Sequence, residues 1–200
     1  MAYQTIRRVV TGHNDAGKAV ILFDGPTPNL LQFEGVPGLV AAVPWLTVGG
    51  AIDFVSDRDP APEGVSIPSF PYAGETILRV ADFPPDADYP AEASTAIFAQ
   101  IDGTEGESAH RETSARHFWF HRTDSLDYAV VLSGEITLLV DDGETTLRAG
   151  DVVVQRATNH AWSNRTNESA RVLFVLIGTP SLPADEIAHA RKARREGDQT

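Results

Sequence analysis

Residues 133–155 read SGEITLLVDDGETTLRAGDVVVQ, and this stretch decides the fold class. Its short runs of β-branched residues and leucine (ITLLV, TTLR, VVVQ) are separated by turn sequences around Gly143 and Gly150. Short strands that follow one another at intervals of about 8–12 residues, with regular turns, are typical of closed barrels and jelly rolls. The stretch therefore predicts an all-β domain.

The same pattern continues in both directions along the chain. DYAVVLSG precedes the stretch, HAWSN and RVLFVLIG follow it, and ETILRVADF at 75–83 alternates well enough to form a strand. HFWFH, which ends at residue 121, is interpreted as part of a further strand over 116–123. We expect these strands to close into one barrel over residues 76–180.

The N-terminal part of the chain is predicted to be a β extension, residues 1–75, that packs on the barrel. IRRVV at 6–10 and AVILF at 19–23 flank a polar, glycine-containing segment, which is a hairpin signal. The apolar stretch 38–55 is predicted as two strand pieces that are interrupted at Pro44 and at Gly49-Gly50, because proline cannot donate to a strand ladder and glycine weakens a strand.

Two further segments differ from the strand pattern. Residues 84–115 are poor in strand residues and are predicted to form a long surface loop or lid, with disorder as the alternative. Residues 181–200 are predicted to be a short C-terminal helix and tail, in which Pro183 suits the first turn and the basic residues lie near the end.

Composition and charge exclude several classes of protein. The net charge of −12 opposes binding to phosphate backbones and to anionic lipid, so we expect neither nucleic acid nor membrane as a partner. The chain has no cysteine, which excludes disulfides, thiolate metal sites and cysteine nucleophiles. No apolar run approaches the roughly 18 residues that span a membrane, and the first residues lack a secretory signal. The expected location is the cytoplasm.

Three polar side chains are candidates for a common site. His121, Asp127 and His160 lie on or beside three different predicted strands, so a barrel could turn them towards one point. Two imidazoles and one carboxylate with open positions form a site that binds Fe(II), Mn, Ni or Zn. The sequence therefore predicts a divalent metal centre with these ligands, although it does not select the metal, and it also predicts that His121 and Asp127 act in catalysis.

The expected pocket wall follows from the two-residue period of a strand. Trp119 and Thr123 share a strand face with His121, and Ala129 and Val131 share a face with Asp127. Trp162 is two residues after His160 and therefore also faces inward. We expect these five neighbours to line the pocket: Thr123, Trp119, Ala129, Val131 and Trp162.

Two segments carry a resemblance to the cupin superfamily. HRTDSLDYAVVLSG at 121–134 resembles the first cupin motif, G-x5-H-x-H-x3/4-E-x6-G. GDVVVQRATNHAWSN at 150–164 resembles the second, G-x5-P-x-G-x2-H-x3-N. The chain is similar to single-barrel bacterial cupins, and this resemblance implies a jelly-roll barrel that holds a small-molecule ligand. Asn164 ends the second motif and is expected to hold a turn by side-chain hydrogen bonds.

The metal motif is degenerate. Thr123 replaces the second histidine, Asp127 replaces the glutamate, and Ala115 replaces the first glycine. The proline and second glycine of the second motif are also missing. Hence at most three of the four usual metal ligands are present.

Several functions fit these residues. The first hypothesis is a metalloenzyme that performs non-redox lyase or isomerase chemistry on a small organic metabolite. The alternatives are a metal-free binding protein for a small molecule, a metal-free isomerase that uses His121 and Asp127, and, with bound iron, a dioxygenase. Whether the protein is an enzyme stays open, with enzyme as the first interpretation. The resemblance to cupins implies a homodimer that forms through barrel edges and N-terminal strands. The sequence does not identify the substrate or the reaction.

Overall fold

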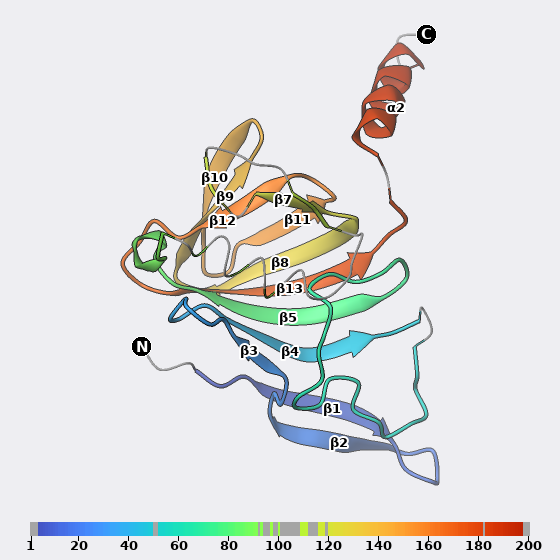
Figure 1. Cartoon of the computed structure of the whole chain (residues 1–200). Helices are drawn as coiled ribbons and strands as arrows, with labels where there is room; N and C mark the ends of the chain where they lie inside the picture. The colour runs from blue at the N-terminus through green and yellow to red at the C-terminus, as the bar shows by residue number, and fades with distance from the viewer. Residues whose placement is uncertain are drawn as a thin grey trace.

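The computed structural model describes residues 4–49, 52–91, 93, 97, 100, 109–111, 116–118, 120–181 and 183–197. Within these ranges the strands form three sheets (Figure 1). The largest sheet has the strand order β11 (Val152–Arg156), β8 (Ser125–Ser133), β13 (Ala170–Gly178), β5 (Thr76–Phe83), β4 (Val40–Thr47) and β3 (Leu30–Gln32). The second has the order β10 (Gly143–Arg148), β9 (Glu135–Val140), β12 (His160–Ser163), β7 (His121–Thr123) and β6 (Ala109–Arg111). β1 (Arg7–His13) pairs only with β2 (Ala19–Pro26) in the third.

The jelly-roll prediction is confirmed by this arrangement. The six-stranded and five-stranded sheets face each other in Figure 1, and every strand pair is antiparallel. Along β13 buried and half-buried residues alternate, so that one face of the strand packs into the core. Val131, Ile136 and Val172 are each at most 2% exposed, and they belong to the core between the sheets.

The N-terminal extension is partly continuous with the barrel. The predicted hairpin is confirmed as β1 and β2. β3 and β4 pair onto β5, so they enlarge the barrel sheet itself. The expected break at Pro44 is wrong, because β4 runs through this residue. The register shifts between Ala42 and Trp45, and this irregularity accommodates a residue that has no N–H to donate. Arg8 of β1 donates to the Pro44 carbonyl and ion-pairs with Asp59, which fastens the hairpin to β4.

The segment 84–115 is not entirely a surface loop. It begins with the short helix η1 (Asp86–Asp88), and β6 lies near its end. Ala93 and Ile97 are helical and at most 2% exposed, since residues four positions apart share one face of a helix that here turns to the core. The prediction of a surface loop is therefore wrong for these residues. Residues 92, 94–96, 98–99, 101–108 and 112–115 lie outside the described ranges.

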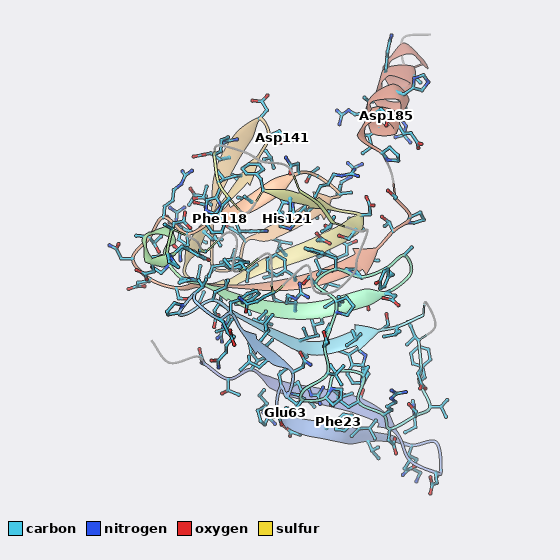
Figure 2. All side chains as sticks on the ribbon, viewed as in Figure 1. Phe23, Glu63, Phe118, His121, Asp141 and Asp185 are labelled. Carbon is cyan, nitrogen blue, oxygen red and sulfur yellow. The ribbon has the colours of Figure 1, made fainter. Side chains whose placement is uncertain are left out.

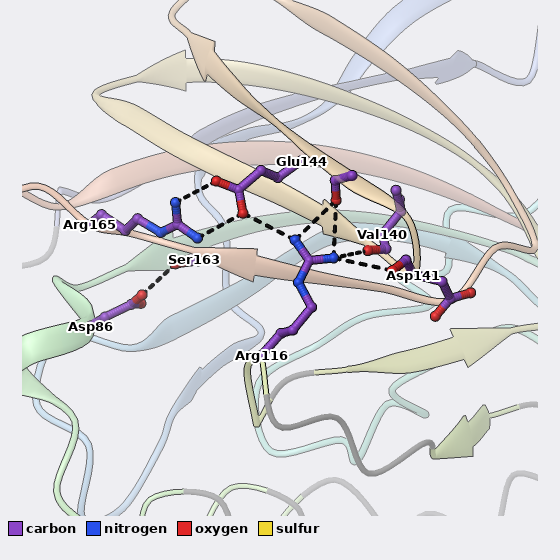
Figure 3. Close-up of polar contacts among 8 residues, drawn as sticks. Asp86, Arg116, Val140, Asp141, Glu144, Ser163 and Arg165 are labelled. Carbon is purple, nitrogen blue, oxygen red and sulfur yellow. Dashed lines mark hydrogen bonds and ion pairs between the residues drawn. The ribbon is translucent and has the colours of Figure 1, made fainter.

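The strand predicted over 116–123 is much shorter, because β7 begins only at His121. Arg116 precedes it in a turn, where its guanidinium donates to the carbonyls of Val140 and Gly143 and pairs with Glu144. Glu144 also binds Arg165, so two cations and one carboxylate hold the turn against the β9–β10 hairpin (Figure 3). The side chain of Arg116, and not a ladder of strand hydrogen bonds, therefore holds this turn in place.

The C-terminal helix is confirmed as α2 (Ala184–Gly197), which stands apart from the barrel in Figure 1. Asp185 and Glu186 occupy its first turn, where the helix dipole favours negative charge. Among the described residues, no helix has the length and apolar character that a membrane span requires.

Candidate functional site

A cavity of about 660 Å³ lies inside the barrel, a size typical of small-molecule sites. Its walls come from both barrel sheets and from the N-terminal segments 27–43 and 63–70. Most of the lining is apolar, and the polar members include Arg79, Asp127, Gln155 and His160. His121, another lining residue, is labelled between the two sheets in Figure 2.

His121 and His160 lie side by side in the site. They are directly opposite each other in the β7–β12 ladder, and their ring centroids are 4.4 Å apart. The Nδ1 atom of His160 lies 2.9 Å from the Thr158 carbonyl oxygen. A neutral imidazole donates from the nitrogen that faces a carbonyl, so Nε2 of His160 keeps its lone pair. Burial, and then the nearby charge of His121, hold the pKa of His160 well below its ordinary value, which keeps this ring neutral.

Asp127 is a buried carboxylic acid on the opposite sheet. Only 3% of the residue is exposed, and its Oδ2 accepts a hydrogen bond of 2.7 Å from the Gln155 amide of β11. Its Oδ1 is buried and has no hydrogen-bond partner among the described residues. Burial raises the pKa of Asp127 to about 6, against the opposing effects of the Ser125 hydroxyl, the Gln155 amide and the Arg79 charge. The group can therefore gain or lose a proton near neutral pH.

Arg79 is a site residue that the sequence interpretation missed. It lies on β5 between the buried residues Ile77 and Ala81 of the same strand face. Its Nη1 and Nη2 donate to the carbonyl oxygens of Ser69 and Pro68 at 2.6 and 3.1 Å. Burial lowers the pKa of Arg79 to about 10, while Asp127 opposes this shift, so the guanidinium is a cation at neutral pH. The available signal was one charged residue on the inward face of ILRVADF.

Only some of the residues predicted to line the pocket do so. Thr123 and Trp162 line the cavity, and the Thr123 hydroxyl lies 2.8 Å from that of Ser125. Ala129 and Val131 face inward and are 2% exposed, but they pack in the core and are not part of the cavity lining. Trp119 lies outside the described residues.

The predicted metal donors do not all come together among the described residues. His121 and His160 are placed to act as two ligands. Asp127 lies on the six-stranded sheet, where its carboxylate accepts a hydrogen bond from Gln155. Within the described part of the chain, no three histidine, aspartate or glutamate side chains come together as a metal site. The described residues thus do not fit the complete centre of two imidazoles and one carboxylate.

Asn164 has the structural role expected of it. The residue is 1% exposed, and its Nδ2 donates to the carbonyls of Phe83 and Glu168. Its Oδ1 accepts hydrogen bonds from the main-chain N–H and the hydroxyl of Thr166. One side chain therefore closes the turn between β12 and β13 and ties it to the end of β5.

Comparison with known proteins gives consistent matches. A family model described as "Cupin domain" matches residues 104–176. Phomopsin biosynthesis cluster protein C' of Diaporthe leptostromiformis is 30% identical over 193 residues, which cover 91% of this chain and 83% of that protein. Cupin-domain-containing oxidoreductase srdD of Neurospora crassa is 27% identical, with 96% of this chain and 82% of that protein covered.

Solved structures are more distant. A Cupin 2 conserved barrel domain protein from Salinispora arenicola aligns with 82% of this chain and 89% of its own, at 16% identity and a TM-score of 0.37. The two curated relatives named above are fungal, so they do not support the predicted kinship with bacterial cupins in particular.

Proposed function

We propose, from the premise that this chain belongs to the cupin superfamily, that it is an enzyme that moves protons on a small organic metabolite inside the barrel. The reaction would be of the isomerase or lyase kind. One observation carries the proposal: a buried acid that titrates near neutral pH shares a cavity with a half-buried cation and a neutral imidazole. Sites of this composition are where acid–base chemistry concentrates.

The proposed chemistry starts with ionised Asp127. Its carboxylate takes a proton from a carbon next to a carbonyl group of the substrate, so that the C–H bond breaks and an O–H bond forms on Asp127. The electron pair moves to the carbonyl oxygen, and the positive charge of Arg79 stabilises the resulting enolate. Return of the proton to another atom completes an isomerisation, whereas departure of a β-substituent completes an elimination. Nε2 of His160 is a second possible proton acceptor.

Hydrogen–deuterium exchange tests this proposal without knowledge of the substrate. Carbonyl compounds of a size that the cavity admits are incubated in D₂O, and ¹H NMR follows the loss of the α-proton signal. We expect exchange with the wild-type protein and a decrease of about 10²–10⁴-fold in Asp127→Asn, since a positioned base contributes roughly that factor. Asp142→Asn, at an exposed turn position, is the matched control and should exchange at the wild-type rate. Exchange by the wild-type protein no faster than in buffer, across the whole set, would reject the proposal.

A metal-dependent oxidoreductase is the second candidate. Three relatives carry the printed name "Cupin-domain-containing oxidoreductase", and the facing imidazoles of His121 and His160 could supply two ligands. Elemental analysis after supplementation with iron, manganese, nickel or zinc separates the candidates. Less than about 0.1 equivalent of each metal would remove the metal-dependent candidate. A ligand that raises the melting temperature but is never converted would instead favour a metal-free binding protein.

A homodimer remains part of the proposal. The edge strand β11 exposes Val152 and Val154 by 63% and 56%, and Tyr128 and Leu132 of neighbouring β8 are 40% and 44% exposed. Apolar side chains grouped at a sheet edge favour association with a second copy. Light scattering tests this, and a monomeric mass at micromolar concentration would contradict it.

A further inference from the structure

We infer that the substrate is a small organic acid, whose carboxylate binds Arg79 and whose apolar body lies against the N-terminal wall of the cavity. This inference rests on the proposed function only in taking the cavity as the substrate site. It adds that the negative charge belongs to the substrate before any reaction begins. It also assigns to Arg79 the selection of that charge.

The first support is the way in which Arg79 is bonded. Among the described residues, its hydrogen bonds go to two main-chain carbonyl oxygens, those of Ser69 and Pro68, which carry no net charge. A guanidinium has five N–H donors in a planar fork, so donors remain for a ligand. Burying a cation is unfavourable unless an anion accompanies it, and a planar carboxylate matches the fork. A bound carboxylate would supply that anion.

The acidic groups of the cavity leave room for such a ligand. Asp127 is the acid whose charge acts on the pKa of Arg79, but the hydrogen bond that its carboxylate accepts comes from Gln155. The Gln155 amide thus supports the Asp127 carboxylate, and the remaining guanidinium donors of Arg79 stay available to a ligand carboxylate. Glu63, the other acid of the lining, is exposed to solvent at the rim.

The second support is the composition of the remaining wall. Away from the polar groups, β3, β4 and the segment 63–70 contribute aliphatic and aromatic side chains, among them Leu31, Val43, Ile67 and Phe70. Burial of apolar surface stabilises a complex by about 25 cal/mol per Å², so this wall favours a hydrocarbon or aromatic body. The cavity volume of about 660 Å³ is larger than a bare two- or three-carbon acid needs. The charge and the wall together select an acid with an apolar body.

A matched pair of probes tests the inference. Hydrocinnamate and hydrocinnamamide share an aromatic body and differ in charge, and isothermal titration calorimetry near neutral pH measures the binding of each. We expect the wild-type protein to bind hydrocinnamate at least about tenfold more tightly, because a hydrogen bond between charged partners is stronger than one to a neutral acceptor. Arg79→Gln should remove this preference while the affinity for the amide stays within about threefold.

Two further variants separate binding from structure. Arg8→Gln also removes a buried guanidinium, one that is outside the cavity lining, and should keep the preference for the acid even if it lowers the melting temperature. Arg79→Lys keeps the charge but loses the fork and should keep part of the preference. If Arg79→Gln does not fold, the preference of the wild-type protein for hydrocinnamate over hydrocinnamamide, and its change in Arg79→Lys, still test the inference.

The inference is overturned by equal binding of acid and amide to the wild-type protein, by binding of neither, or by an undiminished preference in Arg79→Gln. Its failure differs from failure of the proposed function. Selective binding of the acid without any proton exchange would leave the inference standing and reject the enzyme. Proton exchange by the wild-type protein together with equal binding of acid and amide would do the reverse.

Discussion

Replacing Asp127 by asparagine is expected to stabilise the protein at neutral pH while slowing proton transfer by about 10²–10⁴-fold. In the folded protein burial raises the pKa of Asp127 from 3.8 to about 6, so the folded state holds this proton more tightly than the unfolded chain does. Since a tenfold difference in proton affinity corresponds to about 1.4 kcal/mol, ionisation destabilises the fold by up to about 3 kcal/mol. The stability associated with this group is fully present below about pH 4 and is lost as the pH rises through about 6. The asparagine amide can also donate to Oε1 of Gln155, which is buried and has no partner among the described residues.

Urea unfolding at several pH values measures this effect. The free energy of unfolding of Asp127→Asn should exceed that of wild type by an amount that grows between about pH 4 and 6 and then stays constant. Asp142→Asn, at an exposed position, serves as the control and should show no such growth. A difference that is independent of pH, or a variant that is less stable than wild type at neutral pH, would show that Asp127 is not a destabilising buried acid.

Three other results are expected from the same structure. Asn164→Ala should lower the free energy of unfolding by about 3 kcal/mol, because four hydrogen bonds at the β12–β13 turn are lost; urea unfolding measures it, and a change below about 1 kcal/mol would contradict the assigned role. Gly178→Ala should cost about 3 kcal/mol in the same assay, because the added Cβ would lie 1.9 Å from the Tyr72 carbonyl oxygen, and a neutral outcome would show that this contact relaxes freely. The exchange rate should fall as the pH drops through about 6, where Asp127 gains a proton and ceases to be a base, and a flat rate profile would assign the base elsewhere.

Much of the fold could be predicted because strand and turn signals are local. The period-two pattern of β8 places Asp127, Ala129 and Val131 on one buried face, as the structure confirms. The two-residue period of a strand does not show which part of the buried face lines the cavity and which part packs in the core. Asp127 lies at the cavity, whereas Ala129 and Val131 pack in the core, because the walls of the cavity are completed by N-terminal segments that are distant in sequence.

The remaining differences also have physical causes. HFWFH is rich in aromatic residues and therefore suggests a strand, yet the ion pairs of Arg116 hold its start in a turn. The motif spacing brings His121 and His160 opposite each other, but it does not show that Asp127 lies on the other sheet. Strand periodicity predicts which face of β5 is buried, but it does not predict a cavity beside that face. The sequence therefore did not indicate that Arg79 lines the cavity.

A crystal structure of the protein soaked with hydrocinnamate tests the central claim most directly. The account predicts the ligand inside the barrel, with its carboxylate within about 3 Å of the Arg79 guanidinium and its ring against the wall of β3 and β4. Density for the ligand on the outer surface, or side chains of Asp127 and Arg79 that open to solvent away from a shared cavity, would contradict it.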